Sequence, residues 1–143
     1  MPRTFPRAFL VPSLIALVAV SATACSRRGA DLTDPVQIAA DLRGTWSDTI
    51  SYPGISTVFR LTVTDTLVAG DGTYAIEAGR SGTLTVTGVI SGSHVRLVLA
   101  RDFGLITHFD GELTARDLLS GYGWSEVPFG QDPAPMGFKR SGD

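Results

Sequence analysis

The chain has 143 residues with 12 basic and 14 acidic side chains, a net charge of −2. This length suits one domain with one hydrophobic core. The basic residues are scattered and include one lysine, Lys139, so the sequence lacks the clustered positive charge that binding of nucleic acid requires. Its one cysteine, Cys25, excludes an intramolecular disulfide.

Residues 1–24 have the three parts of a secretory signal peptide. A basic leader, Met1–Arg7, precedes an apolar run, Ala8–Val20, and small residues follow at Ser21–Ala24. The apolar run is too short to span a bilayer, which takes about 20 residues. We therefore predict export, with cleavage after Ala24.

Cys25 follows the predicted cleavage point and resembles the lipobox cysteine of bacterial lipoproteins. The resemblance implies acyl chains such as palmitate on Cys25 and attachment to a membrane of the cell envelope, with Ser26 implying the outer membrane. Ala22 stands where this family usually has leucine, and residues 22–24 also fit ordinary signal cleavage without lipid. Residues 25–35 are predicted to be the lipidated N-terminus and a flexible tether.

The folded domain is predicted to occupy residues 36–143, with a short helix at its start. Asp34 can cap a helix over residues 34–43, and Pro35 suits its first turn. Val36, Ala39 and Ala40 would lie on one face of this helix.

Alternating apolar and polar residues, interrupted by turn formers about every ten positions, follow the helix. The pattern predicts eight strands: Gly44–Tyr52, Ser56–Thr64, Leu67–Ala78, Gly82–Ser91, His94–Arg101, Leu105–Thr114, Asp117–Val127 and Gly137–Ser141. The short connections between them permit pairing of sequence neighbours only, which makes the topology an antiparallel meander.

One face of each strand is apolar and predicted to be interior. These residues are Phe59, Leu61, Val63, Leu84, Val86, Gly88, Ile90, Val95, Leu97, Leu99, Phe109, Gly111 and Leu113. Glycines inside the strands, at Gly88, Gly111 and Gly121, favour strong coiling of the sheet and hence a barrel over a sandwich. The expected fold class is all-β: an eight-stranded antiparallel up-and-down meander barrel preceded by a short N-terminal helix.

Gly44-Thr45-Trp46 at the start of the first predicted strand resembles the Gly-x-Trp opening of the calycins, which include lipocalins and avidins. The resemblance implies that Trp46 seals one end of the barrel, and that Arg140, or else Lys139, packs over its ring. The chain is shorter than typical lipocalins and lacks the several tryptophans of an avidin pocket, so biotin binding is not implied. Trp46 as an ordinary large core residue is the alternative.

If Trp46 points inward, Asp48 shares its face and could act as a polar group in a pocket, or it could meet water where the strand ends. Tyr122 and Trp124 share a face of the seventh predicted strand, where they line the barrel mouth or pack as ordinary surface residues. The candidate ligand-binding residues are Trp46, Asp48, Phe59, Tyr74, Phe109 and Trp124.

His108, Asp110 and Glu112 are of the types that bind cations, and they share a strand face. Successive members lie about 7 Å apart, too far to hold one ion by themselves. A solvated face is the favoured interpretation. No metal or other cofactor is predicted, and without a nucleophile, P-loop or metallopeptidase motif we do not expect an enzyme.

The leading functional hypothesis is an exported, membrane-anchored binding module for a small apolar or amphipathic ligand. The alternative is a solid barrel that acts as a structural or protein-binding envelope lipoprotein, for example as an inhibitor of an enzyme. A hollow interior would favour the first hypothesis, whereas a filled interior with an exposed apolar patch around Val89, Val98 or Phe129 would favour the second.

Overall fold

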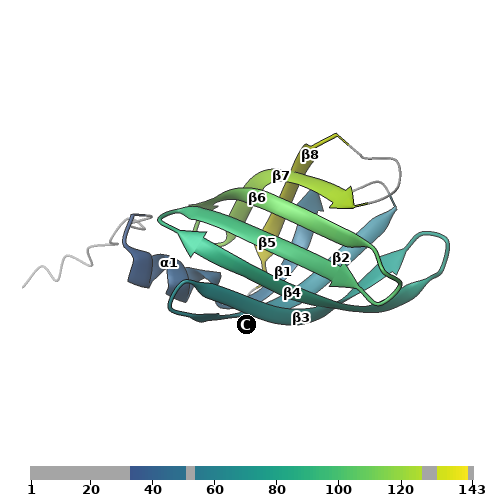
Figure 1. The fold of residues 1–143 in the computed structure, drawn as a ribbon, viewed down its shortest axis with the longest axis horizontal. Helices are drawn as coiled ribbons and strands as arrows, with labels where there is room; N and C mark the ends of the chain where they lie inside the picture. The colour runs from purple at the N-terminus through teal and green to yellow at the C-terminus, as the bar shows by residue number, and fades with distance from the viewer. Residues whose placement is uncertain (1–32, 51–53, 127–131, 142–143) are drawn as a thin grey trace, which may run out of the picture.

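The computed structural model describes residues 33–50, 54–126 and 132–141 of the chain. Helix α1 (Pro35–Leu42) precedes strands β1 (Gly44–Ile50), β2 (Ile55–Thr64), β3 (Leu67–Ile76), β4 (Ser81–Ser91), β5 (His94–Arg101), β6 (Ile106–Ala115), β7 (Leu118–Glu126) and β8 (Ala134–Arg140). Each strand pairs antiparallel with the next, and β8 pairs with β1 to close a barrel (Figure 1). The predicted fold class is confirmed. The predicted signal peptide and Cys25 lie outside the described residues.

The strand boundaries follow the predicted ones closely, with the main difference at β8. This strand begins at Ala134, three residues before the predicted start at Gly137. Pro135 is exposed on the outer face and pairs with Tyr122 of β7. A proline lacks an N–H and is therefore confined to positions such as the start of a strand. The sequence around Pro135 indicates a loop, so the predicted strand begins later than the observed one.

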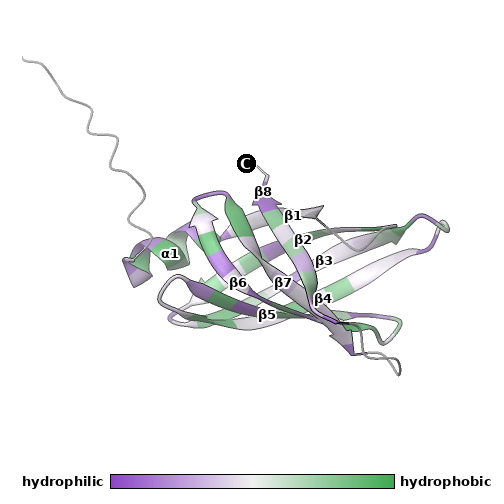
Figure 2. Ribbon diagram, turned by 90° about the horizontal axis from the view of Figure 1, so that it is seen from above, coloured by the Kyte–Doolittle hydropathy of each residue, from purple (hydrophilic) through white to green (hydrophobic). Residues whose placement is uncertain are grey.

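Buried and exposed residues alternate along the strands, so one face of the sheet lines the interior and the other faces solvent. Strand β2 shows it most regularly, with Thr57, Phe59, Leu61 and Val63 buried and every residue between them exposed. Figure 2 shows apolar and polar segments alternating along β5 and β6. The predicted interior residues are buried except Gly88, which is partly exposed, so the assignment of the two faces is confirmed for β2, β4, β5 and β6.

Glycines let neighbouring strands and interior rings approach closely. A Cβ atom at Gly72 would collide with the backbone of β2 at Val58, and one at Gly111 would lie 2.5 Å from Cζ of Phe109. Gly111 and Gly121 are also direct partners across β6 and β7. These positions admit no side chain without movement of the sheet, which agrees with the predicted role of glycine in coiling the strands.

Helix α1 closes one end of the barrel (Figure 1). The Asp34 side chain accepts a hydrogen bond of 2.9 Å from the Val36 N–H and caps the helix as predicted. The expected apolar face is wrong, because Val36 is 78% exposed and the buried face carries Ile38, Asp41 and Leu42. Within the described ranges, no helix combines the length and apolar character needed to cross a membrane.

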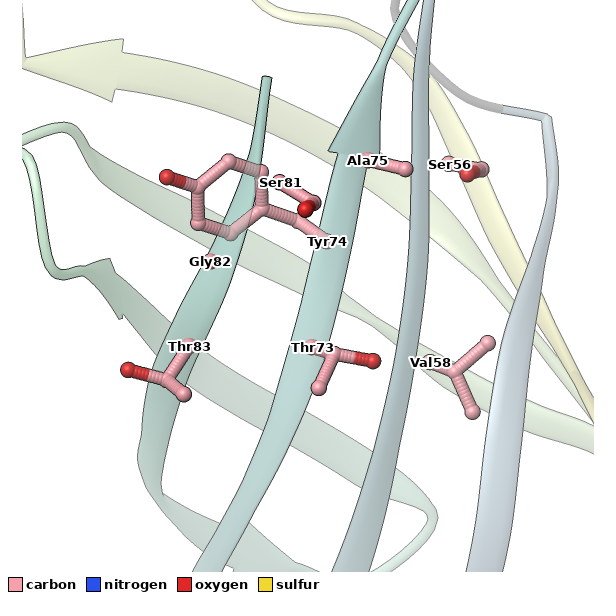
Figure 3. Close-up of a pocket in the computed structure, with 8 residues that line it drawn as sticks. All are labelled: Ser56, Val58, Thr73, Tyr74, Ala75, Ser81, Gly82 and Thr83. Carbon is pink, nitrogen blue, oxygen red and sulfur yellow. The ribbon is translucent and has the colours of Figure 1, made fainter. Parts of the chain in front are cut away.

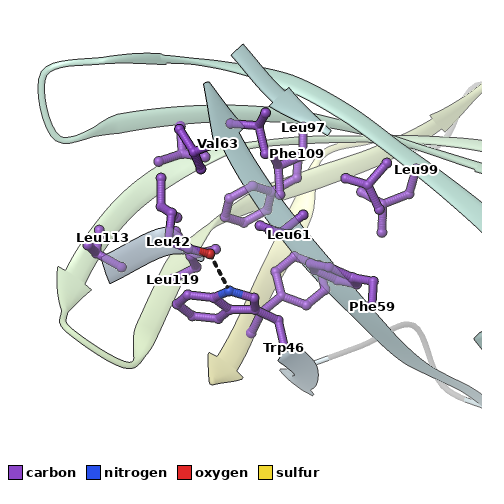
Figure 4. Packing of buried hydrophobic residues seen from close by; sticks show 14 of the residues in the cluster. Leu42, Trp46, Phe59, Leu61, Val63, Leu97, Leu99, Phe109, Leu113 and Leu119 are labelled. Atoms are coloured by element: carbon purple, nitrogen blue, oxygen red, sulfur yellow. Dashed lines mark hydrogen bonds between the residues drawn. The ribbon is translucent and has the colours of Figure 1, made fainter. Parts of the chain in front are cut away.

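Large side chains fill the half of the barrel next to α1. The Phe138 ring meets Phe59 edge-on, with centroids 4.9 Å apart, and Phe109 in the same way at 5.3 Å. Trp46 lies beside them and donates its indole N–H to the Leu42 carbonyl at 2.8 Å (Figure 4). These four rings are 0–1% exposed, so they border no space that admits a water molecule. This half of the barrel is solid.

Candidate functional site

The interior becomes polar toward the end of the barrel opposite α1, here called the open end because no helix of the described residues covers it. The inward-facing rows that carry Trp46, Phe59, Leu99 and Phe109 continue there as polar residues. This polar layer consists of Asp48, Thr57, Arg101, Thr107 and Ser125. It gathers residues from β1, β2, β5, β6 and β7, because the up-and-down order brings the end of one strand beside the start of the next.

Arg101 is the centre of the polar layer and is only 7% exposed. Its Nη1 donates to the Thr107 hydroxyl at 2.8 Å, and its Nη2 donates to the Thr57 hydroxyl at 3.4 Å. Thr107 in turn shares a hydrogen bond of 3.2 Å with Ser125. Burial lowers the pKa of Arg101, whereas Tyr74 and the Asp48 carboxylate raise it. The guanidinium remains charged, since an arginine titrates far above neutral pH.

Two buried atoms of the polar layer have no hydrogen-bond partner. Asp48 accepts the Thr57 N–H at 3.0 Å through Oδ1, but its Oδ2 is unpaired, and so is Nε of Arg101. In the described part of the chain no ion pair joins the two side chains directly. An unpaired buried polar group costs about 1–3 kcal/mol, and more when it is charged. The layer therefore holds an unused donor and an unused acceptor.

Aromatic rings connect the polar layer to the rim of the barrel. The Arg101 guanidinium lies 5.8 Å from the centroid of the Tyr74 ring, which lies 5.2 Å from that of Phe103. The Arg80 guanidinium follows at 5.9 Å from the Phe103 ring. This column runs from the interior to the surface: Tyr74 is buried and Phe103 is exposed. Contacts between cations and rings of this kind are favourable.

A hydrogen bond to the loop after β5 fixes the position of Tyr74. Its hydroxyl donates to Asp102 Oδ1 at 2.7 Å, and Asp102 Oδ2 accepts the Thr83 N–H at 2.9 Å. The Thr83 N–H, and then the Tyr74 hydroxyl, hold the pKa of Asp102 below its usual value, while burial and the bond to Asp102 raise the pKa of Tyr74. A side chain at Gly82 would collide with Tyr74 and Asp102, so a glycine at this position leaves room for their hydrogen bond.

A shallow groove lies outside the barrel wall beside Tyr74 (Figure 3). Small residues of β2, β3 and β4 form most of its lining: Ser56, Val58, Thr73, Ala75, Ser81, Gly82 and Thr83. None of these side chains is charged. The groove therefore offers hydroxyl groups but no group that would fix a particular ligand.

The structure places the six candidate ligand-binding residues in three different parts of the barrel. Asp48 and Tyr74 both lie at the open end beside Arg101, and Asp48 points inward instead of lying free in water. Trp46, Phe59 and Phe109 lie in the solid half. Trp124 faces the outside, where its ring stacks on His108 at 5.1 Å and 12°.

The basic residue expected near Trp46 lies at the sealed end. Arg140 is the direct partner of Trp46 across β1 and β8. Its guanidinium donates to the backbone carbonyls of Asp41 and Arg43, at 3.0 and 3.4 Å, at the C-terminal end of α1. A cation is favourable at this end of a helix. Lys139 is exposed.

The row of His108, Asp110 and Glu112 lies on the outer face of β6. His108 contacts Glu126, and Asp110 pairs with Arg96 at 3.2 Å and with His94. Among the described residues, no three His, Cys, Asp or Glu side chains are arranged to hold a metal ion. These charged groups pair with one another across the strands instead.

Sequence reasoning did not select Arg101, Thr57, Thr107 or Ser125. A signal for three of them exists, because the period of two that places Leu99, Phe59 and Phe109 inside also places their neighbours two positions away inside. No protein-family model matches the chain, and no curated protein sequence matches it. The closed eight-stranded barrel is compatible with a calycin-like fold.

Proposed function

We propose that this protein is an exported lipoprotein of the cell envelope, anchored through Cys25, whose barrel binds a small amphipathic ligand at its open end. The proposal includes kinship with the calycins and an outer-membrane location. In this function the apolar half beside α1 stabilises the fold, and the polar layer recognises the ligand. No catalytic role is assigned to the barrel.

The observation that carries the proposal is the buried guanidinium of Arg101. Burial of a charged group costs free energy unless the group is fully paired, yet Arg101 has two hydroxyl partners and an unpaired Nε. Binding pockets combine an apolar wall with a few aimed polar groups of this kind. Leu84 and Met136 supply buried apolar surface at the same end, and Arg101 and Ser125 retain 7% and 8% exposure.

The solid half limits the size of the ligand. Because the rings around Trp46 border no free space, a ligand cannot extend the length of the barrel. It would lie between the polar layer and the rim, with its apolar part against residues such as Met136. This favours a small ligand over a long-chain lipid.

Replacing Arg101 with methionine should abolish ligand binding, because the aimed charge is lost while the volume is nearly kept. The full, processed chain is incubated with an envelope lipid and metabolite extract, and bound species are identified by native mass spectrometry. The matched control is Arg96→Met, which removes an exposed arginine from the outer face of the same strand. Loss in both variants, or retention in both, would contradict the assignment to Arg101.

A protein-binding function is the second candidate, and the solid half of the barrel supports it. Leu67 and Val89 are direct partners on the outer face, 62% and 44% exposed. Exposed apolar pairs of this kind occur at protein interfaces, although this pair is small. Phe129 lies outside the described residues. An empty mass spectrum for the unmodified protein would favour this candidate over ligand binding.

Replacing Cys25 with serine should release the protein from membranes. Serine cannot carry the thioether-linked lipid, and several acyl chains at about 0.8 kcal/mol per methylene otherwise make attachment effectively permanent. Fractionation of cells into membrane and soluble parts, with immunodetection of the chain, measures the change. Replacing Ser26 with alanine is the neighbouring control and should leave the chain attached. Membrane attachment of the Cys25→Ser protein would show that acylation is not the anchor.

A further inference from the structure

The two unpaired atoms of the polar layer differ in kind and in charge. Nε of Arg101 is a donor on a cation, and Oδ2 of Asp48 is an acceptor on an anion. We infer that the ligand carries an acceptor and a donor together, as a zwitterionic group of the amino-acid type does. This inference rests on the proposed function and specifies the class of its ligand.

The charges of the layer argue against a ligand with one charge. The Asp48 carboxylate acts on Arg101 through space, since it raises the pKa of the guanidinium. An anionic ligand at Arg101 would therefore meet repulsion from Asp48, and a cationic ligand at Asp48 would meet repulsion from Arg101. The other members of the layer, Thr57, Thr107 and Ser125, are neutral. A zwitterion satisfies both charges at once.

Neighbouring charged groups do not alter this balance. Asp102 is the carboxylate beside Tyr74, and its two oxygens already accept hydrogen bonds from Tyr74 and Thr83. Arg80 lies at the outer end of the aromatic column, against the exposed ring of Phe103. Among the described residues one further buried side-chain atom lacks a hydrogen bond, Oδ2 of Asp41, and it lies on α1 at the sealed end. Arg101 and Asp48 are therefore the pair with unused hydrogen-bonding capacity at the open end.

An ordered water molecule is the competing occupant, because water also donates and accepts. Three six-carbon probes separate the possibilities: norleucine is zwitterionic, hexanoate is anionic and hexylammonium is cationic. Their dissociation constants are measured by isothermal titration calorimetry on the full, processed chain in nonionic detergent, with detergent alone as the blank. We expect norleucine to bind roughly tenfold more tightly than either singly charged probe.

The variant Asp48→Asn tests the role of the carboxylate at nearly constant volume. It should strengthen hexanoate binding, weaken norleucine binding and so reverse their order, since the repulsion and the acceptor charge are both removed. Asp71→Asn is the control, because Asp71 is an exposed carboxylate on the outer face of β3. This control should leave the order of the three probes unchanged.

The possible outcomes distinguish a zwitterionic ligand from the binding function itself. Tighter binding of hexanoate than of norleucine to the unmodified protein, with no effect of Asp48→Asn, would overturn the zwitterion and leave the binding function standing. Failure of all three probes would overturn the inference. The binding function itself falls only if the extract experiment also yields no bound species.

Discussion

Replacing Trp46 with alanine should lower the free energy of unfolding by about 3–5 kcal/mol. The indole is fully buried between α1 and the rings of the solid half, so its removal leaves a cavity that these rings cannot fill. The change also removes the hydrogen bond of 2.8 Å to the Leu42 carbonyl, which joins the helix to the barrel. Urea denaturation followed by circular dichroism measures the loss as a lower midpoint.

The chain contains a matched control for this experiment in its second tryptophan. Trp124 lies on the outer face and stacks on His108, so Trp124→Ala should cost about 1 kcal/mol or less. Trp46→Phe should cost an intermediate amount, since it keeps a ring but loses the N–H donor. Equal losses from the two alanine variants would contradict the sealing role of Trp46.

Replacing Gly72 with alanine should destabilise the barrel by about 1–3 kcal/mol or more, although the change adds one methyl group. The added Cβ would collide with the backbone of β2 at Val58 and with Cβ of Phe59, which lies 2.6 Å away. Backbone atoms of a closed barrel cannot move aside without disturbing the register of the neighbouring strand. Thermal unfolding would show the effect as a lower midpoint.

The control for Gly72 is Ala69→Ser on the same strand. Ala69 is exposed on the outer face, where a slightly larger side chain meets water, and its replacement should change stability by less than about 0.5 kcal/mol. Comparable destabilisation by the two variants would show that β3 as a whole is sensitive to substitution, and that the close approach at Gly72 has no special importance.

The fold could be predicted because several independent signals agree along the sequence. The period of two, the short turns and the capping residue Asp34 all act locally, and closure of the barrel follows from a meander that would otherwise leave two open edges. The position of Trp46 at the sealed end can also be predicted, from the Gly-x-Trp motif in which it occurs. Pro135 shows the limit, because a proline at the start of a strand has the same local signature as a loop.

The candidate site is harder to predict from the sequence. The interior of a barrel is identified by its apolar residues, and the polar layer is an exception to that rule. Arg101 ends a row of buried leucines, and a charge at the end of a strand ordinarily indicates the transition to water. Strand β7 reverses the usual hydropathy, since Gly121, Gly123 and Ser125 face inward while Trp124 faces outward. A Cβ atom at Gly121 would collide with the β6 backbone, and one at Gly123 would collide with the Met136 side chain of β8. These contacts appear only when β7 is paired with its two neighbours.

The seal formed by α1 also determines which way the barrel is presented. The chain enters the domain at the sealed end, and Cys25 precedes Thr33, the first described residue, by eight positions, a reach of at most about 29 Å when extended. A lipid on Cys25 would therefore tether the closed end toward the bilayer and leave the open end directed at the surrounding aqueous compartment. Such a protein would exchange its ligand with solution or with a soluble donor, and would not draw it from the membrane that holds it.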